Sequence, residues 1–153
     1  MGATAGRTTL NGEGLQHQDG HSLLHASTVP SCRAWDPAYA YELATIIEHG
    51  IDEMWGKDKD IFHYIMLYNQ NEQQPPKPKG IDADLMRGAY LFSEAADGEG
   101  PVIRLLGSGP ILSHVREAAE NVDRIWSKVR SLVSTFLWGT TKSRTSSGEG
   151  NPT

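Results

Sequence analysis

The run Ile61–Tyr68, IFHYIMLY, constrains the fold of this chain more than any other feature, because nearly every residue in it is apolar. The run ends at the polar residue Asn69. Such a pattern is typical of a central strand in a parallel sheet that helices cover on both faces. His63 lies inside the run and is predicted to be a hydrogen-bonded core histidine rather than a ligand. The chain is therefore predicted to have an α/β fold.

An amphipathic helix is predicted over Pro37–Trp55, ahead of this strand, because apolar residues recur there at helical spacing. Asp36 followed by Pro37 is typical of a helix start, with the aspartate as N-cap and the proline at the first helical position. Gly56 is a suitable C-terminal stop. Two short β-prone segments, Ala26–Val29 and Cys32–Trp35, precede the helix.

The second half of the chain begins after a proline-rich connector, NQNEQQPPKPKG, which places a domain boundary near Gly80. A short helix is predicted over Asp82–Gly88, and β-prone segments follow at Ala89–Glu94 and Val102–Leu106, which could pair with each other. The sequence GSG comes next, and exposed amides at such a helix start can bind phosphate. GSG lacks the lysine and spacing of a Walker motif, so a tight turn between a strand and a helix is favoured.

The last part of the chain carries an apolar stripe at helical spacing from Ile111 to Phe136. Local periodicity therefore predicts one long helix from Pro110 to about Trp138. The tail that follows, GTTKSRTSSGEGNPT, is polar and rich in Gly, Ser and Thr, so it is predicted to be disordered.

The candidate site is the polar, glycine-rich stretch Arg7–Leu24, RTTLNGEGLQHQDGHSLL. Its glycines favour a tight loop over a helix or a strand. A carboxylate close to a histidine can fix the tautomer and protonation of the imidazole, as acid–base chemistry or anion recognition requires. The alternative is a solvated loop without chemistry. Five side chains in the stretch could take part: Glu13, His17, Asp19, His21 and Ser22.

A zinc site is a further alternative, since His17, His21 and His25 would share one side of a helix. The glycines make a helix through all three unfavourable, so no metal site is predicted. Cys32 is the only cysteine, which excludes an internal disulfide, suits the cytoplasm and indicates a buried structural thiol. The net charge of −5 gives no reason to expect nucleic-acid binding. No apolar run approaches the roughly 20 residues that span a membrane.

Three segments, GRTTLNGEGLQHQDGHS, PSCRAWDPAYAYELATIIEHGIDEMWGKDKD and VIRLLGSGPILSHVREAAE, resemble the homodimeric pyruvate dehydrogenase component family. More distantly, the first resembles the substrate loop of transketolases. The resemblance covers about Gly6 to Glu120. It implies a partial thiamin-diphosphate-binding, transketolase-like fold. Residues 1–80 would end the pyrimidine-binding domain, 81–120 would begin the C-terminal domain, and 121–153 would be a divergent helical extension and tail.

The same resemblance implies the role of the loop. In the family, Glu13 and His17 would line the pocket around the reactive cofactor carbon and the bound 2-oxo acid, while Asp19, His21 and Ser22 would hold the loop. The full-length enzyme would use thiamin diphosphate and magnesium to decarboxylate pyruvate. It would then reductively acetylate a lipoyl group of the acetyltransferase component, and it would act as a cytoplasmic homodimer.

Other parts of that machinery have no counterpart here. The Gly-Asp-Gly motif with a downstream asparagine, which clamps the cofactor diphosphate through magnesium, is absent. The isolated chain is therefore expected to be inactive. The alternative is a truncated, non-catalytic product, arising from a frameshift or a gene end, that self-associates through the long terminal helix.

Overall fold

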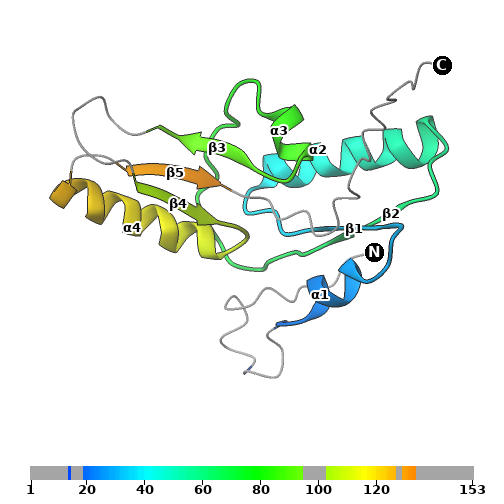
Figure 1. The fold of residues 1–153 in the computed structure, drawn as a ribbon, viewed down its shortest axis with the longest axis horizontal. Coiled ribbons are helices and arrows are strands. Elements are labelled where there is room, and N and C mark those ends of the chain that lie inside the picture. The colour runs from blue at the N-terminus through cyan, green and yellow to red at the C-terminus, as the bar shows by residue number, and fades with distance from the viewer. Residues whose placement is uncertain (1–13, 15–18, 95–102, 127–128, 134–153) are drawn as a thin grey trace, which may run out of the picture.

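A computed structural model describes residues 14, 19–94, 103–126 and 129–133. They form two small sheets, each with helices packed against it (Figure 1). Strands β1 (Cys32–Trp35) and β2 (Phe62–Ile65) form the first sheet and run parallel. The second sheet has the order β3 (Tyr90–Ser93), β5 (Val129–Val133) and β4 (Ile103–Gly107). The predicted α/β class with parallel strands is confirmed.

Helices cover both faces of the first sheet, as the apolar run predicts. Helix α1 (Ser22–Ser27) packs Leu23 against one face, in a cluster with Ala34 and Met66. Helix α2 (Ala40–Ile51) packs Ile46 against Trp35 on the other face. Among the described residues, β2 has only β1 as a neighbour, so here it is not the central strand that the apolar run predicts.

Two sequence-based boundaries before β2 are wrong. Ala26 and Ser27 belong to α1 rather than to a strand, since this short helix buries Leu23 on the sheet. Helix α2 begins at Ala40 with Tyr39 as N-cap, three residues later than predicted. Asp36 is not its cap but is fully buried.

Helix α2 continues into a π-helical turn, Asp52–Gly56, before the chain turns back into β2. The amide of Lys57 donates to the carbonyl of Asp52 at 2.8 Å, which closes the wider turn. The ammonium group of Lys57 also pairs with the Asp52 carboxylate at 2.6 Å. Helix α2 and this turn therefore end close to Gly56, where the sequence predicts the stop.

The second sheet contains a parallel β4–α4–β5 crossover. Helix α4 (Ile111–Trp126) ends well before Trp138, and β5 then pairs with β4 in parallel and with β3 in antiparallel orientation. The predicted helix from Pro110 to about Trp138 is therefore wrong. Backbone pairing with strands on both sides overrides the helical periodicity of this segment. Because β5 lies between them, β3 and β4 do not pair with each other, contrary to prediction. The predicted disordered tail, residues 139–153, lies outside the described residues.

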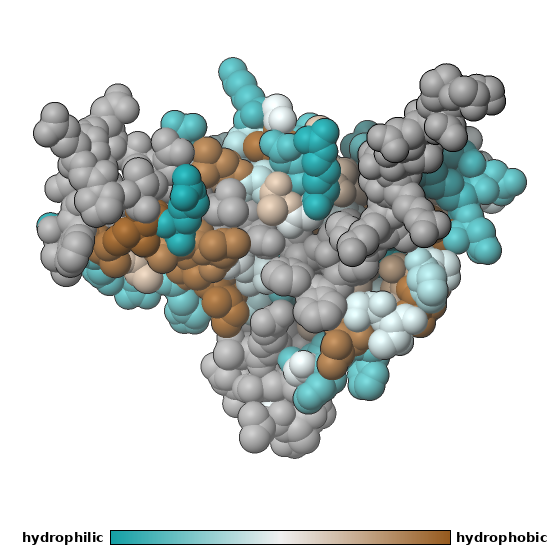
Figure 2. Space-filling view, viewed as in Figure 1, coloured by the Kyte–Doolittle hydropathy of each residue, from teal (hydrophilic) through white to brown (hydrophobic). Residues whose placement is uncertain are grey.

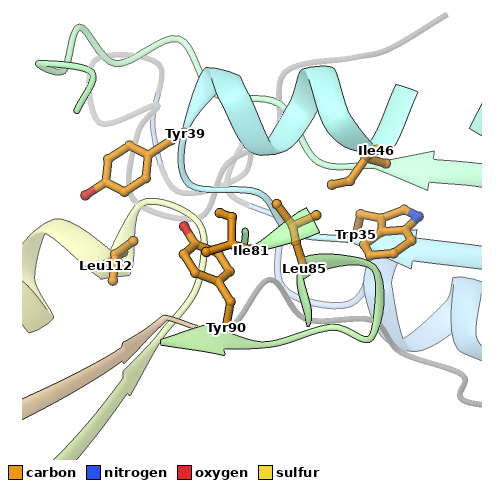
Figure 3. Close-up of a cluster of buried hydrophobic side chains, with 7 residues drawn as sticks. All are labelled: Trp35, Tyr39, Ile46, Ile81, Leu85, Tyr90 and Leu112. Carbon is orange, nitrogen blue, oxygen red and sulfur yellow. The ribbon is translucent and has the colours of Figure 1, made fainter. Parts of the chain in front are cut away.

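One hydrophobic core joins the elements on the two sides of the connector (Figure 3). The short helix α3 (Asp82–Met86), which lies within the predicted segment, contributes the fully buried Leu85. Leu85 lies between Tyr90 of β3 and the pair Trp35 and Ile46 from the first sheet and its helix. The other buried members of this core are Tyr39, Ile81 and Leu112.

Candidate functional site

Asp19 fixes the chain where the predicted site loop enters α1. Its Oδ1 atom accepts hydrogen bonds from the backbone amides of His21, at 3.1 Å, and Ser22, at 3.0 Å. Both amides belong to the start of the helix, where no preceding turn supplies a carbonyl partner. The carboxylate also lies at the positive end of the helix dipole. Asp19 therefore caps the N-terminal end of α1, which directly follows the predicted loop.

The two other predicted supporting residues lie beside it. Ser22 is the half-buried first residue of α1, and His21 is the exposed residue that precedes it. One helical turn separates His21 from His25, and the centroids of their rings are 6.5 Å apart. Among the described residues, no group of three His, Cys, Asp or Glu side chains could hold a metal ion. The structure thus brings Asp19, His21 and Ser22 together.

Glu13 and His17, the predicted catalytic pair, lie outside the described residues. Gly14, which follows Glu13, is described and is half-buried with a φ of 98°. Only glycine adopts this left-handed backbone region at little cost. A side chain at position 14, directly after the predicted catalytic residue Glu13, would therefore strain the backbone.

The GSG turn is clamped from the end of β1. The hydroxyl of Ser108 donates to Oδ2 of Asp36 at 2.8 Å, and the amide of Gly109 donates to the Asp36 carbonyl at 3.1 Å. A carboxylate therefore already lies at the N-terminal end of α4, where a phosphate would otherwise bind. The cofactor diphosphate does not fit this turn, and the turn serves to join the two halves of the structure.

A second buried acid, Glu42, joins α2 to β3. Its Oε1 accepts the Tyr90 hydroxyl at 2.6 Å, and its Oε2 accepts the amide of Ala38 at 2.7 Å. The Tyr90 hydroxyl also forms a short hydrogen bond with that of Tyr41. Burial raises the pKa of the Glu42 carboxyl to about 7, even though the hydrogen bonds lower it. Glu42 is therefore a buried group that titrates near neutral pH.

Sequence reasoning did not single out Glu42, although a signal was present. Glu42 shares the buried face of α2 with Thr45 and Ile46, so a carboxylate interrupts the stripe that faces the core. Such a carboxylate needs hydrogen-bond partners, because an unpaired buried acid is costly. The sequence alone does not show that the partner is Tyr90, which is 48 residues away.

His63 is hydrogen-bonded, as predicted, but it is half-buried and lies outside the two clusters of buried hydrophobic side chains. The indole Nε1 of Trp35 donates to Nδ1 of His63 at 2.8 Å, and the two rings are stacked. Burial lowers the pKa of this imidazole. Its ring also lies 3.2 Å from the position that a Cβ atom on Gly50 would occupy, so α2 packs closely against it.

A hollow of about 180 Å³ lies outside the carboxyl ends of β1 and β2, the edge at which ligands bind in many parallel sheets. The hydroxyl of Tyr68 is buried in this region and has no hydrogen-bond partner among the described residues. None of Asp19, His21 and Ser22 lines the hollow. Its lining combines apolar and polar residues, which include Pro37, Leu43, Met66, Gln70, Glu72 and Gln74.

Solved structures of similar fold include transketolases. A crystal structure of a transketolase from Pichia stipitis superposes on 88% of this chain and 18% of its own, with a TM-score of 0.66 and 19% sequence identity. This similarity defines the fold as a segment of a transketolase-type α/β protein.

Sequence comparisons narrow that class. A family model for the pyruvate dehydrogenase E1 component middle domain matches residues 1–75. The pyruvate dehydrogenase E1 component of Pseudomonas aeruginosa is 54% identical over 120 residues, which cover 78% of this chain and 14% of the relative. That of Mycolicibacterium smegmatis is 44% identical over 141 residues, covering 91% of this chain and 15% of the relative. The chain is therefore a homologue of the pyruvate dehydrogenase E1 component, in the region of its middle domain.

The chain spans about one seventh of the length of these relatives. The alignment with the Mycolicibacterium smegmatis relative covers 91% of the chain and so extends beyond Glu120, whereas the alignment with the Pseudomonas aeruginosa relative covers 120 residues. In the structure, β5 follows α4. No helix among the described residues is long and apolar enough to cross a membrane.

Proposed function

We propose that this chain carries the substrate loop of a pyruvate dehydrogenase E1 component. The observation that carries the proposal is the 54% identity with the Pseudomonas aeruginosa relative. The Asp19 carboxylate, which binds the first amides of α1 directly after the loop, adds support. The whole enzyme would decarboxylate pyruvate and pass the acetyl unit to a lipoyl group of the acetyltransferase component.

His17 would act on the substrate side of that reaction. Its imidazole would donate a hydrogen bond to the carboxylate or the developing oxyanion of the bound 2-oxo acid, which stabilises charge that increases in the transition state. Glu13 would orient this imidazole and raise its pKa. Asp19, His21 and Ser22 would hold the loop in place.

Thiamin diphosphate, bound with magnesium, would supply the carbanion chemistry in the whole enzyme. The described residues do not fit its diphosphate, because the Asp36 carboxylate lies at the GSG turn. By itself, the chain should bind the cofactor more weakly than about 1 µM, and calorimetric titration with magnesium present measures this affinity. Micromolar or tighter binding would contradict the expectation that this chain lacks the residues that clamp the cofactor diphosphate.

A chimera tests the catalytic proposal. Residues 1–120 of this chain would replace the matching segment of the Pseudomonas aeruginosa enzyme, and pyruvate turnover would be measured with the lipoyl acceptor. We expect the chimera to be active. His17→Ala should lower turnover on the order of 10²–10³-fold while cofactor affinity changes little.

His25→Ala is the matched control, because His25 is an exposed imidazole on α1 without an assigned role. Its turnover should stay within a few-fold of the unmutated chimera. A folded, cofactor-loaded chimera without turnover would contradict the proposal. Near-normal turnover in His17→Ala would contradict the role given to His17.

The alternative function is a non-catalytic product that self-associates. It depends on the predicted long helix from Pro110 to about Trp138. Because α4 ends at Trp126 and β5 follows, that basis is lost.

A further inference from the structure

The hollow outside the carboxyl ends of β1 and β2 has the size and the lining of a small-molecule site. A volume of about 180 Å³ suits a ligand of roughly six to eight non-hydrogen atoms. Three separate segments meet around it, which are the start of α2, the chain from Met66 to Gln74, and Pro110 just before α4. Leu43 and Met66 supply apolar surface beside a set of polar side chains, the combination that ligand pockets show.

The charges at the hollow favour a cationic ligand. Among the described residues that line it, Glu72 is the only one with a charged side chain, and it is half-buried. Its carboxylate forms no ion pair with a described residue. A second carboxylate, that of Asp36, is fully buried next to the lining residue Pro37. Both would repel an anion and attract an ammonium group.

The donors at the start of α2 are already bound, so they do not offer an anion site. The amide of Ala40 donates to Oε1 of Gln74 at 2.9 Å, and the amide of Ala38 donates to Glu42. The guanidinium group of Arg116 reaches the lining residue Tyr39, but it donates to that phenol at 3.0 Å. The positive end of the helix is therefore occupied by side chains of this chain.

The hydroxyl of Tyr68 supplies an acceptor. It is buried and forms no hydrogen bond with a described residue, which is a costly state for a polar group. It lies on the same side of Gly109 as Oδ1 of Asp36, since both atoms would overlap a Cβ atom added there. The negative charge of Asp36 favours the rotamer that points the phenol proton toward it. The lone pairs of the Tyr68 oxygen then remain for a donor on the ligand.

We infer that this hollow binds a small primary amine in its ammonium form. The apolar stem of the amine would lie against Leu43 and Met66, and its ammonium group would bind the Glu72 carboxylate or the Tyr68 hydroxyl oxygen. An ammonium group carries three donors and no acceptor, which matches this set of partners. The inference does not rest on the proposed catalysis, and its test measures binding rather than turnover.

Benzylamine, with about eight non-hydrogen atoms, is the probe, and calorimetric titration of the full chain at neutral pH measures its affinity. We expect a dissociation constant of about 0.1–1 mM, as for other ligands of this size. Benzyl alcohol has nearly the same shape without the charge, and it should bind about tenfold more weakly. Benzoate should not bind measurably. Equal affinities for the amine and the alcohol, or tighter binding of benzoate, would overturn the inference.

Two variants test the polar partners. Glu72→Gln should weaken benzylamine binding about tenfold and leave benzyl alcohol binding nearly unchanged, because it removes the charge and keeps the shape. Tyr68→Phe should weaken benzylamine binding about threefold to fivefold. Glu48→Gln is the matched control, since Glu48 is an exposed carboxylate of α2 that does not line the hollow. An equal loss in Glu48→Gln and Glu72→Gln would contradict the assignment, and circular dichroism verifies the fold of each variant.

Two further variants test the location. Ala40 lines the hollow, so Ala40→Leu should fill part of it and abolish the binding of both the amine and the alcohol. Figure 2 shows apolar surface over β4 and α4, where Leu106 is 61% exposed and could adsorb a benzyl group instead. Leu106→Gln should leave the affinity unchanged. Binding that survives Ale40→Leu, or that is lost in Leu106→Gln, would place the site elsewhere and overturn the inference.

The lysine side chain of a peptide offers the same ammonium group as a free amine. Lysine with an acetylated α-amino group and an N-methylamide is therefore the comparison compound. Its backbone amides would lose water without gaining partners at the hollow, so it should bind more weakly than benzylamine. Tighter binding of the lysine compound would contradict the assignment to a free amine.

Discussion

The phenol of Tyr90 donates a hydrogen bond of 2.6 Å to Oε1 of Glu42, and almost no solvent reaches either side chain. Glu42 lies in α2, against the first sheet, while Tyr90 begins β3 of the second sheet. Among the described residues, no lysine or arginine forms an ion pair with Glu42. Hydrogen bonds therefore stabilise this carboxyl, and they couple the two sheets.

Tyr90→Phe should lower the free energy of unfolding by about 1–3 kcal/mol, because it leaves a buried acceptor without its donor. Urea unfolding followed by tryptophan fluorescence measures the change. Tyr64→Phe is the control, since the half-buried Tyr64 forms no side-chain hydrogen bond with a described residue. The control should differ from the native chain by less than about 0.5 kcal/mol. Equal losses in the two variants would contradict the role of the Glu42 contact.

Glu42 should also make stability depend on pH. Its pKa is raised to about 7 in the folded chain, from an ordinary value of 4.5. Between these values the folded state binds a proton that the unfolded state has released, so the contribution of Glu42 to stability falls as pH rises. The total loss is up to about 3 kcal/mol, and it is complete above the folded-state pKa.

Glu42→Gln removes that titration. Urea unfolding at several pH values should show a flatter profile for this variant than for the native chain between pH values of about 4.5 and 7. Other groups, His63 among them, titrate in both proteins and cancel in the comparison. Parallel profiles, or a native chain that gains stability relative to the variant as pH rises, would contradict the prediction.

Gly109→Ala should destabilise the chain by about 2–4 kcal/mol. Gly109 has a φ of +51°, and an added Cβ atom would lie 2.5 Å from Oδ1 of Asp36 and would also overlap the hydroxyl of Tyr68. Gly80→Ala separates backbone strain from this overlap. Gly80 has a φ of +76°, but no atom lies within 4 Å of its added Cβ. It should cost only about 1 kcal/mol, and thermal unfolding of both variants measures the difference.

The parts of the fold that depend on short-range patterns could be predicted from the sequence. The apolar run Ile61–Tyr68 predicts a strand in a parallel sheet that helices cover on both faces. In the structure β2 pairs with β1 in parallel, and α1 and α2 pack on the two faces. The hydrogen bond of His63 agrees with the expectation drawn from the same run. The segment Arg7–Leu24 is recognisable because its residue order, and not its composition, carries the resemblance. The predicted loop is too long, however, since Ser22–Leu24 belong to α1.

The errors come from long-range contacts. The helical stripe after Ile111 is genuine at the sequence level, but β5 gains backbone pairing on both edges, and no local pattern contains that information. Asp36 has the sequence of an N-cap, yet its carboxylate pairs with Ser108, which is 72 residues away. The partner of Glu42 is equally remote in the chain, so its role could not be read from α2 alone.

Asp19→Ala should loosen the junction between the site loop and α1 without unfolding the chain. Losing the hydrogen bonds to the His21 and Ser22 amides should cost about 1 kcal/mol locally, which is roughly a fivefold increase in amide exchange at the start of α1. In the chimera with the Pseudomonas aeruginosa enzyme, turnover should fall while cofactor affinity is retained, because the proposed imidazole of His17 is misplaced. Asp19→Asn keeps an acceptor oxygen and should recover most of the turnover.

Thr28→Val separates positioning of the loop from stability of the helix. The hydroxyl of Thr28 donates to the carbonyl of His25 at 2.7 Å, at the opposite end of α1. Losing this hydrogen bond should increase amide exchange in α1. Turnover should stay nearly unchanged, since the loop joins the other end of the helix. If Thr28→Val lowers turnover as much as Asp19→Ala, or if Asp19→Ala reduces cofactor affinity instead of turnover, Asp19 does not act by positioning the loop.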